Sequence, residues 1–182
     1  MSKIPKATKF AKEKHKHQTR DDGKTPYWKH LEKVVGNIKT LGIKDPVILC
    51  AGWLHDTIED TDTDFDKIED KFGKETAEIV AIVTKDTRMR KKERETAYCK
   101  QLKTGSWQAQ IVKFADILAN LEDLENSKKS KLKCEEQAQN KLEYYKSIKH
   151  GLQKNKKNIP NLDSQTIRLS EVFSKYDVKS LN

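Results

Sequence analysis

A short segment in the first half of the chain gathers side chains that could hold a metal ion. The apolar run 47–54 leads directly into His55 and Asp56, and Glu59 and Asp60 follow. In a helix, positions four apart stack on one face, so an imidazole and three carboxylates would meet at one spot. Such carboxylates repel one another and lose hydration when buried, and a cation relieves both costs. The alternative, a solvated helix end, would place three carboxylates where the helix dipole opposes them.

Two more residues elsewhere in the chain could complete a metal shell. His30 stands in PYWKHL at the start of a predicted helix, and Asp116 stands in VKFADILANL among apolar residues. An aspartate in an apolar helical stripe is rare unless it is paired or ligated. Two histidines and two aspartates form a mixed nitrogen and oxygen shell, which suits manganese, iron or zinc better than calcium. We therefore predict one divalent metal ion bound by His30, His55, Asp56 and Asp116.

Helices must position these groups. Glycine and proline are scarce, at 7 and 4 residues, and apolar residues recur at helical spacing. The loop 20–26 is dense in helix breakers, and Asp45 and Pro46 mark a helix start that leads through the apolar run into the segment 55–60. We predict a single all-α domain over residues 1–182 with about eight or nine helices: 3–19, 28–41, 45–60, 63–72, 74–84, 92–103, 107–125, 131–154 and 163–176.

Charge and composition narrow the functional class. The net charge is +9, yet residues 45–72 hold nine acidic residues against two lysines, and residues 128–157 hold ten lysines against three glutamates. The lysine block is interpreted as a solvated helix face, with binding of an anionic ligand as the alternative. No apolar run approaches the length of a membrane span, and the first 20 residues lack the apolar block of a secretory signal. With three widely spaced cysteines, this favours a cytoplasmic protein. His15, His17 and His150 are predicted to be surface residues.

The order of these motifs resembles a known enzyme family. The stretches RDDGKTPYWKH, LHDTIEDTDTD, FGKETAEIVAIVTKD and VKFADILANLEDL, over about residues 4–152, are similar to the hydrolase domain of RelA/SpoT-type enzymes in the HD phosphohydrolase superfamily. The small single-domain alarmone hydrolases are the most similar. The resemblance implies an HD-type helical bundle around one manganese ion (Fe²⁺ or Zn²⁺ being alternatives) and removal of the 3′-pyrophosphate of (p)ppGpp. It assigns Glu59 and Asp60 to water activation, and Arg20 and Asn120 to substrate binding.

Several positions depart from the family pattern. Leu31 replaces the usual proline after the first ligand, and Asp21 replaces the usual lysine after the loop arginine. Lys24 from the same loop is expected to compensate for Asp21, and Lys85 to neutralise further phosphate charge. Lys141 stands where the family has an aromatic substrate contact. These changes touch base and ribose recognition rather than the metal.

Two alternative functions remain open from the sequence. One is an HD-domain phosphohydrolase that acts on another nucleotide, such as a dNTP, a nucleoside monophosphate or a 2′- or 3′-phosphorylated nucleotide. The other is a non-catalytic module that binds nucleotide or nucleic acid through the lysine block. The lysine block has little aromatic interleaving and no RNA-binding motif, which argues against nucleic acid. The expected partner is a phosphorylated nucleotide.

Overall fold

The structure, a computed structural model, describes residues 3–176 and 178, and in them the chain is all-helical. The only strand-like pairing among these residues is an isolated bridge between Thr19 and Pro26. The helices are α1 (Ile4–Lys14), α2 (Trp28–Thr40), α3 (Pro46–Leu54), α4 (Thr57–Asp60), α5 (Phe65–Phe72), α6 (Lys74–Val83), α7 (Lys91–Thr104), α8 (Trp107–Leu124), α9 (Lys131–Lys154) and α10 (Leu162–Ser174), with a 3-10 turn at Lys156–Asn158. The prediction of one all-α domain is confirmed.

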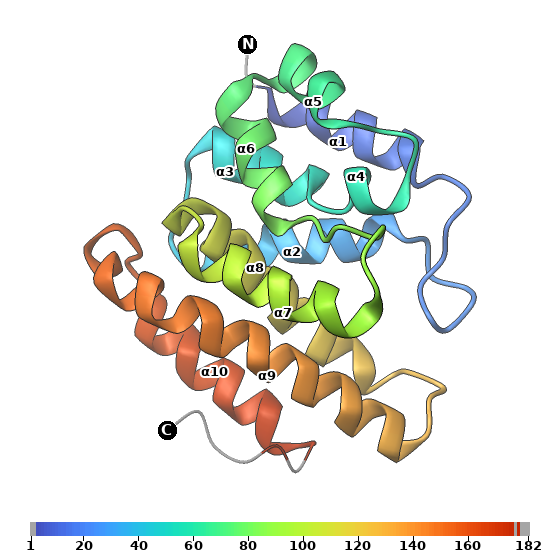
Figure 1. Cartoon of the computed structure of the whole chain (residues 1–182), viewed down its shortest axis with the longest axis vertical. Coiled ribbons are helices and arrows are strands. Elements are labelled where there is room, and N and C mark those ends of the chain that lie inside the picture. The colour runs from blue at the N-terminus through green and yellow to red at the C-terminus, as the bar shows by residue number, and fades with distance from the viewer. Residues whose placement is uncertain (1–2, 177, 179–182) are drawn as a thin grey trace.

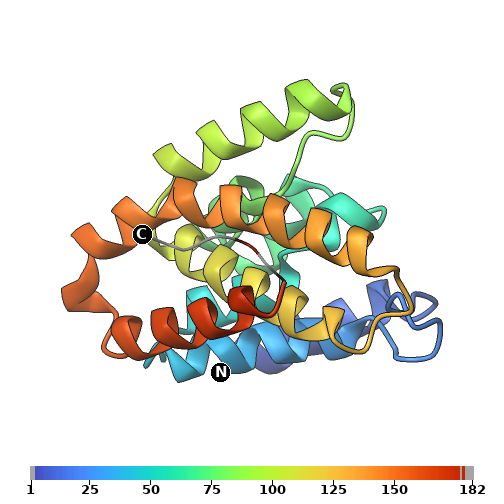
Figure 2. The ribbon, with the colours of Figure 1, turned by 90° about the horizontal axis from the view of Figure 1, so that it is seen from below.

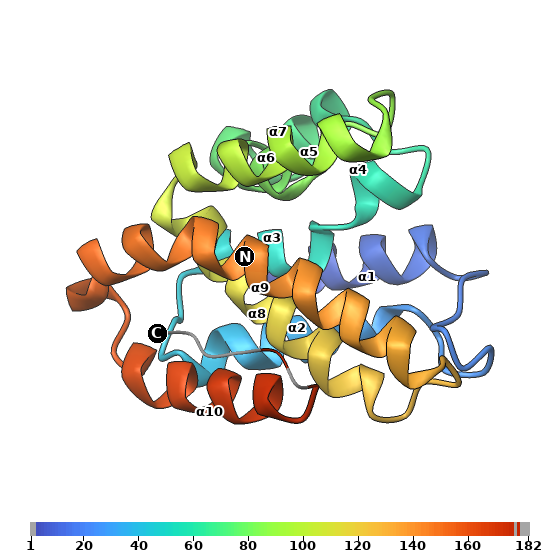
Figure 3. The same cartoon turned by 60° about the horizontal axis from the view of Figure 1, so that its bottom comes forward.

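The helices are arranged around α8. It packs against α2 and α9 most extensively, and also against α3, α6 and α10. Figure 1 shows α1, α5 and α6 gathered at one end of the molecule, with α9 and α10 at the other. In the turned views, α7 lies on one side of α9 and α10 on the opposite side (Figures 2 and 3).

Helix α8 is buried all round over residues 109–119, whereas the sequence suggested a single apolar stripe. Its polar residues Gln110, Lys113 and Asp116 are enclosed together with its apolar ones. A buried polar side chain needs a partner, because an unpaired one costs free energy. We therefore expect Gln110, Lys113 and Asp116 to form hydrogen bonds or ion pairs inside the bundle.

The predicted helix 45–60 is divided in two, α3 and α4. Asp45 caps α3 by accepting a hydrogen bond from the Val47 backbone N–H at 2.8 Å. At the far end, the Thr57 hydroxyl donates to the Leu54 carbonyl at 2.6 Å, and the His55 ring bonds the Gly52 carbonyl. These side chains satisfy carbonyls that a continuing helix would have used. The result is a turn at residues 55 and 56, followed by the single helical turn α4.

Helix α9 shows how the lysine block is accommodated. Its buried face carries residues such as Ala138, Leu142, Tyr145 and Ile148, while most lysines of the block lie exposed. The solvated-face interpretation therefore holds for most of the block. Within the described ranges, no helix has both the length and the apolar character needed to cross a bilayer.

Close packing between α8 and α9 gives a first prediction. A Cβ built on Gly151 would lie 2.0 Å from Gln110 Oε1, and the Gln110 amide is held by a 3.0 Å hydrogen bond to the Leu102 carbonyl. We expect Gly151→Ala to lower the free energy of unfolding by about 1–3 kcal/mol, because overpacking displaces a buried side chain.

The matched control is Gly36→Ala in α2, where nothing lies within 4 Å of the added Cβ. It should raise stability by about 0.5–1 kcal/mol, because alanine favours the helix interior more than glycine does. Urea unfolding of both variants measures the difference. Equal effects would show that the contact at Gly151 does not limit helix packing.

Candidate metal centre and substrate pocket

Three helical elements bring the four predicted ligands together. His30 comes from α2, His55 and Asp56 from the turn between α3 and α4, and Asp116 from the middle of α8. His30 Nε2 lies 3.2 Å from Asp116 Oδ1 and 3.7 Å from Asp56 Oδ2. His55 Nε2 lies 3.0 Å from Asp56 Oδ2 and 3.6 Å from Asp116 Oδ1. Two ring nitrogens and two carboxylate oxygens therefore converge on one small, buried volume.

The hydrogen bonds of His55 favour ligation by its Nε2 atom. Its Nδ1 lies 2.9 Å from the Gly52 carbonyl, and a carbonyl only accepts, so Nδ1 carries a proton. Nε2 is buried and makes no hydrogen bond, although Asp56 Oδ2 is close. With Nδ1 protonated, a metal ion that displaces any proton from Nε2 would meet the Nε2 lone pair between the two carboxylates. This is the usual arrangement of a metal-ligating histidine.

The charge balance of the cluster calls for a cation. Burial disfavours a charged His55 ring, but the carboxylates of Asp56 and Asp116 overcome this and raise the His55 pKa to about 10. Burial also lowers the pKa of His30, despite the same two carboxylates. Two enclosed carboxylates therefore hold a positive charge between them. A divalent ion in the same place would replace the proton on His55.

Neighbouring side chains on α8 fix the orientation of Asp116. Lys113 donates to Asp116 Oδ2 at 2.7 Å, and the Asn120 amide donates to Asp116 Oδ1. Burial raises the Asp116 pKa, and the lysine charges at Lys113 and Lys141 outweigh it and hold that pKa well below its usual range. Asp116 is therefore an ionised carboxylate, with Oδ2 committed to Lys113 and Oδ1 directed toward the two histidines.

The predicted water-activating pair lies next to this cluster. The Tyr27 hydroxyl contacts Asp56 Oδ2 at 2.7 Å and Asp60 Oδ2 at 3.1 Å. Burial and the charges of Asp56 and Glu59 raise the Asp60 pKa to about 6. Such a carboxyl group can both hold and release a proton near neutral pH. Glu59 Oε2 accepts the Lys85 backbone N–H at 3.1 Å, which ties the single turn α4 to the segment after α6.

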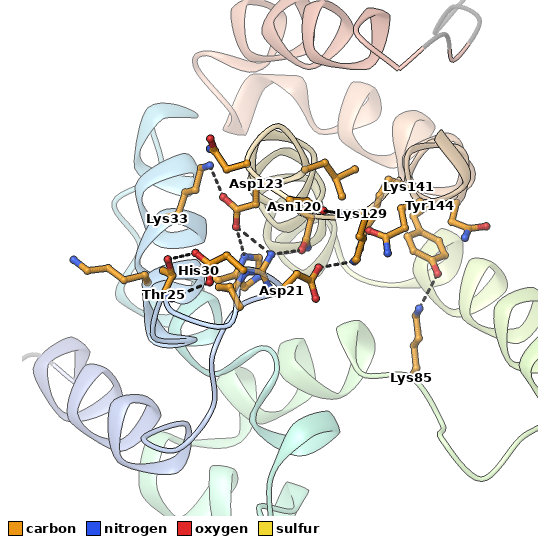
Figure 4. A pocket seen from close by; sticks show the side chains of 18 of the residues that line it. Asp21, Thr25, His30, Lys33, Lys85, Asn120, Asp123, Lys129, Lys141 and Tyr144 are labelled. Atoms are coloured by element: carbon orange, nitrogen blue, oxygen red, sulfur yellow. Dashed lines mark hydrogen bonds and ion pairs between the residues drawn. The ribbon is translucent and has the colours of Figure 1, made fainter. Parts of the chain in front are cut away.

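A cavity of about 510 Å³ opens beside His30. Three of the four predicted substrate-binding residues line it, namely Arg20, Lys85 and Asn120. The Arg20 guanidinium donates to Asn120 Oδ1 at 3.0 Å and pairs with Asp123 at 3.0 Å. Figure 4 shows side chains from the loop before α2, from α8 and from α9 facing this cavity.

The fourth predicted substrate contact, Lys24, is placed differently. Its side chain is exposed and does not line the cavity, although Asp21, Asp22 and Thr25 of the same loop do. Asp22 accepts hydrogen bonds from the backbone N–H groups of Lys24 and Thr25, which fixes the loop. The structure thus gives Lys24 a place beside the cavity rather than in its wall.

The prediction that His15 is a surface residue is wrong. His15 is fully buried, stacks on Tyr27 with ring centroids 4.8 Å apart, and bonds Gln18 through Nδ1 at 2.6 Å. Burial lowers its pKa, so the ring is neutral and supports the tyrosine that bridges Asp56 and Asp60. The exposed positions of His17 and His150 agree with the prediction.

Sequence reasoning also missed three residues of the site: Tyr27, Lys113 and Asp123. Tyr27 and Lys113 lie within three residues of predicted ligands, at positions i−3 from His30 and Asp116. That helical spacing was a usable signal. Asp123 pairs with Arg20 and with Lys33, and only the folded chain brings those three together.

These features define an all-α domain with a histidine and aspartate centre, and comparison with known proteins gives the same class. The family model described as "HD domain" matches residues 7–151, so the chain belongs to the HD-domain family. That family implies a divalent-metal site. The residues present fit one, because His30, His55 and Asp56 offer ligand atoms within 4.8 Å of one another and His55 Nε2 lacks a hydrogen-bond partner.

Individual relatives carry a more specific name. The chain is 44% identical over 123 residues to the guanosine-3′,5′-bis(diphosphate) 3′-pyrophosphohydrolase MESH1 of Xenopus tropicalis, covering 66% of this chain and 69% of that one. Identity to human MESH1 is 41% over 128 residues, covering 68% and 70%. The Aquifex aeolicus enzyme of the same activity is 34% identical over 152 residues, which are 82% of this chain but 21% of that longer protein.

A solved structure supports the same relationship. The structure of a metazoan orthologue of SpoT that hydrolyses ppGpp superposes with a TM-score of 0.83 at 27% identity. The match covers 96% of each chain, so it includes α9 and α10 as well as the helices that carry the predicted metal ligands.

Proposed function

We propose that this protein is a metal-dependent (p)ppGpp 3′-pyrophosphohydrolase, which produces GDP or GTP and pyrophosphate. The observation that carries the proposal is the convergence of His30 Nε2, His55 Nε2, Asp56 Oδ2 and Asp116 Oδ1 beside a cationic cavity. The identity of the nucleotide is inferred from the activity that names its relatives. Within this proposal residues 1–182 act as one hydrolase domain.

The four converging residues are the proposed ligands, and manganese is the proposed ion. When bound, a divalent ion supplies Lewis-acid activation of water and neutralises charge on a phosphoryl oxygen. The mixed nitrogen and oxygen donor set suits manganese, and it suits Fe²⁺ or Zn²⁺ as alternatives. A cytoplasmic location, where the nucleotide substrate would be found, is part of the same proposal.

The chain's own residues would then manage the proton and the substrate. Glu59 and Asp60 hold the attacking water and take its proton, and the raised Asp60 pKa of about 6 suits this role. Tyr27 keeps Asp56 and Asp60 in fixed relative positions through its two hydroxyl contacts. Arg20, held by Asn120, offers its guanidinium to phosphate oxygens.

A screen of substrates with identification of the products tests the proposed function. The manganese-loaded protein should convert ppGpp to GDP and pyrophosphate, as measured by ³¹P NMR and mass spectrometry. Orthophosphate release from a nucleoside monophosphate, or turnover of a dNTP with none of ppGpp, would instead support an HD phosphohydrolase for another nucleotide. Asp21 is the residue that favours this alternative substrate. It places a carboxylate in the cavity wall and forms an ion pair with Lys129 at 2.5 Å.

A further inference from the structure

The lysines and the arginine that line the cavity are almost all committed to carboxylates. Arg20 and Lys33 share Asp123 at 3.0 and 2.8 Å. The remaining pairs are Lys29 with Glu32 at 2.9 Å, Lys85 with Glu95 at 3.3 Å and Lys129 with Asp21 at 2.5 Å. The cavity's positive charge is therefore largely balanced before any ligand arrives.

Lys141 is different. It lines the cavity from α9, and within the described part of the chain no hydrogen bond or ion pair engages its ammonium group. Its Nζ lies 5.7 Å from the centroid of the Tyr144 ring. Figure 4 shows Lys141 and Tyr144 together on the α9 side of the cavity, with Lys85 joined to the Tyr144 hydroxyl.

The surroundings of Lys141 make its charge costly without an anion. Lys85 Nζ and Lys113 Nζ lie 4.8 and 5.0 Å from the same Tyr144 ring, so three ammonium groups from three elements surround one aromatic side chain. Burial first, and then the charges of Lys113 and Lys85, lower the Lys141 pKa to about 8, against the attraction of Asp116 and Asp56. An anionic ligand beside Lys141 would remove this penalty, as charge-assisted hydrogen bonds do.

We propose that Lys141, together with Lys85, forms a subsite for the terminal phosphoryl group of a pyrophosphate substrate. This rests on the proposed function. In that reaction, water oxygen bonds to the inner phosphorus, the ribose 3′-oxygen leaves with the electron pair and receives a proton, and pyrophosphate departs whole. The terminal phosphoryl group takes no part in the bond change, yet it carries charge that needs a cation near the metal cluster.

The subsite would make the enzyme select a 3′-pyrophosphate over a 3′-monophosphate. Lys85 can contribute by exchanging Glu95 for the phosphoryl oxygens, and its 2.7 Å hydrogen bond to the Tyr144 hydroxyl keeps it on the correct wall. Lys141 needs no such exchange. Replacing Lys141 should therefore weaken binding of the terminal phosphoryl group most directly.

The test compares two nucleotides with the same base and 5′ end: guanosine carrying a 5′-diphosphate with either a 3′-diphosphate or a 3′-monophosphate. We expect Lys141→Met to lower kcat/KM for the 3′-diphosphate by about 10- to 100-fold, the range for a lost hydrogen bond to a charged group. The inhibition constant of the 3′-monophosphate should stay within about twofold, and Lys141→Arg should restore most of the rate.

The matched control is Lys146→Met on the same helix, where the lysine is 54% exposed and paired with Glu143 at 2.9 Å. It should change neither nucleotide's parameters. Equal losses for both nucleotides in Lys141→Met, or no loss for either, would overturn the subsite. Thermal melts verify that all variants are folded.

A binding measurement separates failure of the subsite from failure of the proposed function. Inorganic pyrophosphate is titrated into the metal-loaded protein, with the same metal in the buffer, and compared with orthophosphate. Lys141→Met should weaken pyrophosphate about tenfold and leave orthophosphate unchanged. This result would uphold the subsite even if ppGpp were not hydrolysed, whereas unchanged pyrophosphate binding would refute it even in an active ppGpp hydrolase.

Discussion

Replacing Asp116 by alanine should abolish both metal binding and hydrolysis. Asp116 Oδ1 lies 3.2 and 3.6 Å from the Nε2 atoms of His30 and His55, so the carboxylate closes the cluster from the α8 side. Changes to residues that only support a ligand already cost 10- to 100-fold in metal affinity or activity. Loss of a ligand should therefore cost more than about 100-fold. Metal analysis of the purified variant and pyrophosphate release from ppGpp measure the two effects.

The same change also leaves a buried charge without its partner. Lys113 is buried and bonds Asp116 Oδ2 at 2.7 Å, and breaking a buried pair costs about 3–5 kcal/mol. Asp116→Asn, which keeps the volume, separates loss of the ligand from loss of the fold. Asp163→Asn serves as the control, because Asp163 is exposed, pairs with Lys156 and does not line the cavity. Activity retained in a metal-free Asp116 variant would refute the metal centre.

Glu59→Gln should keep the metal and lose most of the turnover. A glutamine oxygen can still accept the Lys85 backbone N–H that Glu59 Oε2 accepts at 3.1 Å, so the position of α4 should be preserved. The amide cannot take a proton from water, and loss of a general base lowers kcat by about 10²–10⁴-fold. The measurement is kcat with saturating ppGpp alongside metal content.

Glu78→Gln on α6 is the matched control, because Glu78 is exposed and its ion pair is with Lys74 of its own helix. It should behave like the unaltered protein. Loss of metal in Glu59→Gln would make Glu59 a ligand rather than a base, and unchanged turnover would leave Asp60 as the residue that takes the proton.

The helices were predictable from local pattern, and their ends less so. The segment 131–154 was predicted with the bounds that α9 has, because its apolar residues follow a regular helical spacing. The break at residues 55 and 56 was not predicted, since it depends on the side chains of His55 and Thr57 bonding carbonyls of α3. Periodicity records which residues are apolar, but not where side chains replace the backbone's own partners.

The site residues also fall into those that the sequence predicted and those that it did not. The four proposed metal ligands were assigned from residue type, helical spacing and motif order, and the structure brings them together. Residues whose role depends on contacts between distant segments could not be predicted from the sequence. His15 stands among lysines in the sequence, and only the fold stacks it on Tyr27. The place of Lys141 in the cavity wall likewise depends on how α9 packs.

Anomalous X-ray scattering from a crystal of the manganese-loaded protein tests the metal centre most directly. We expect one manganese peak within bonding distance of His30 Nε2, His55 Nε2, Asp56 Oδ2 and Asp116 Oδ1. A manganese peak at another place, or no peak at these four atoms under saturating manganese, would contradict it.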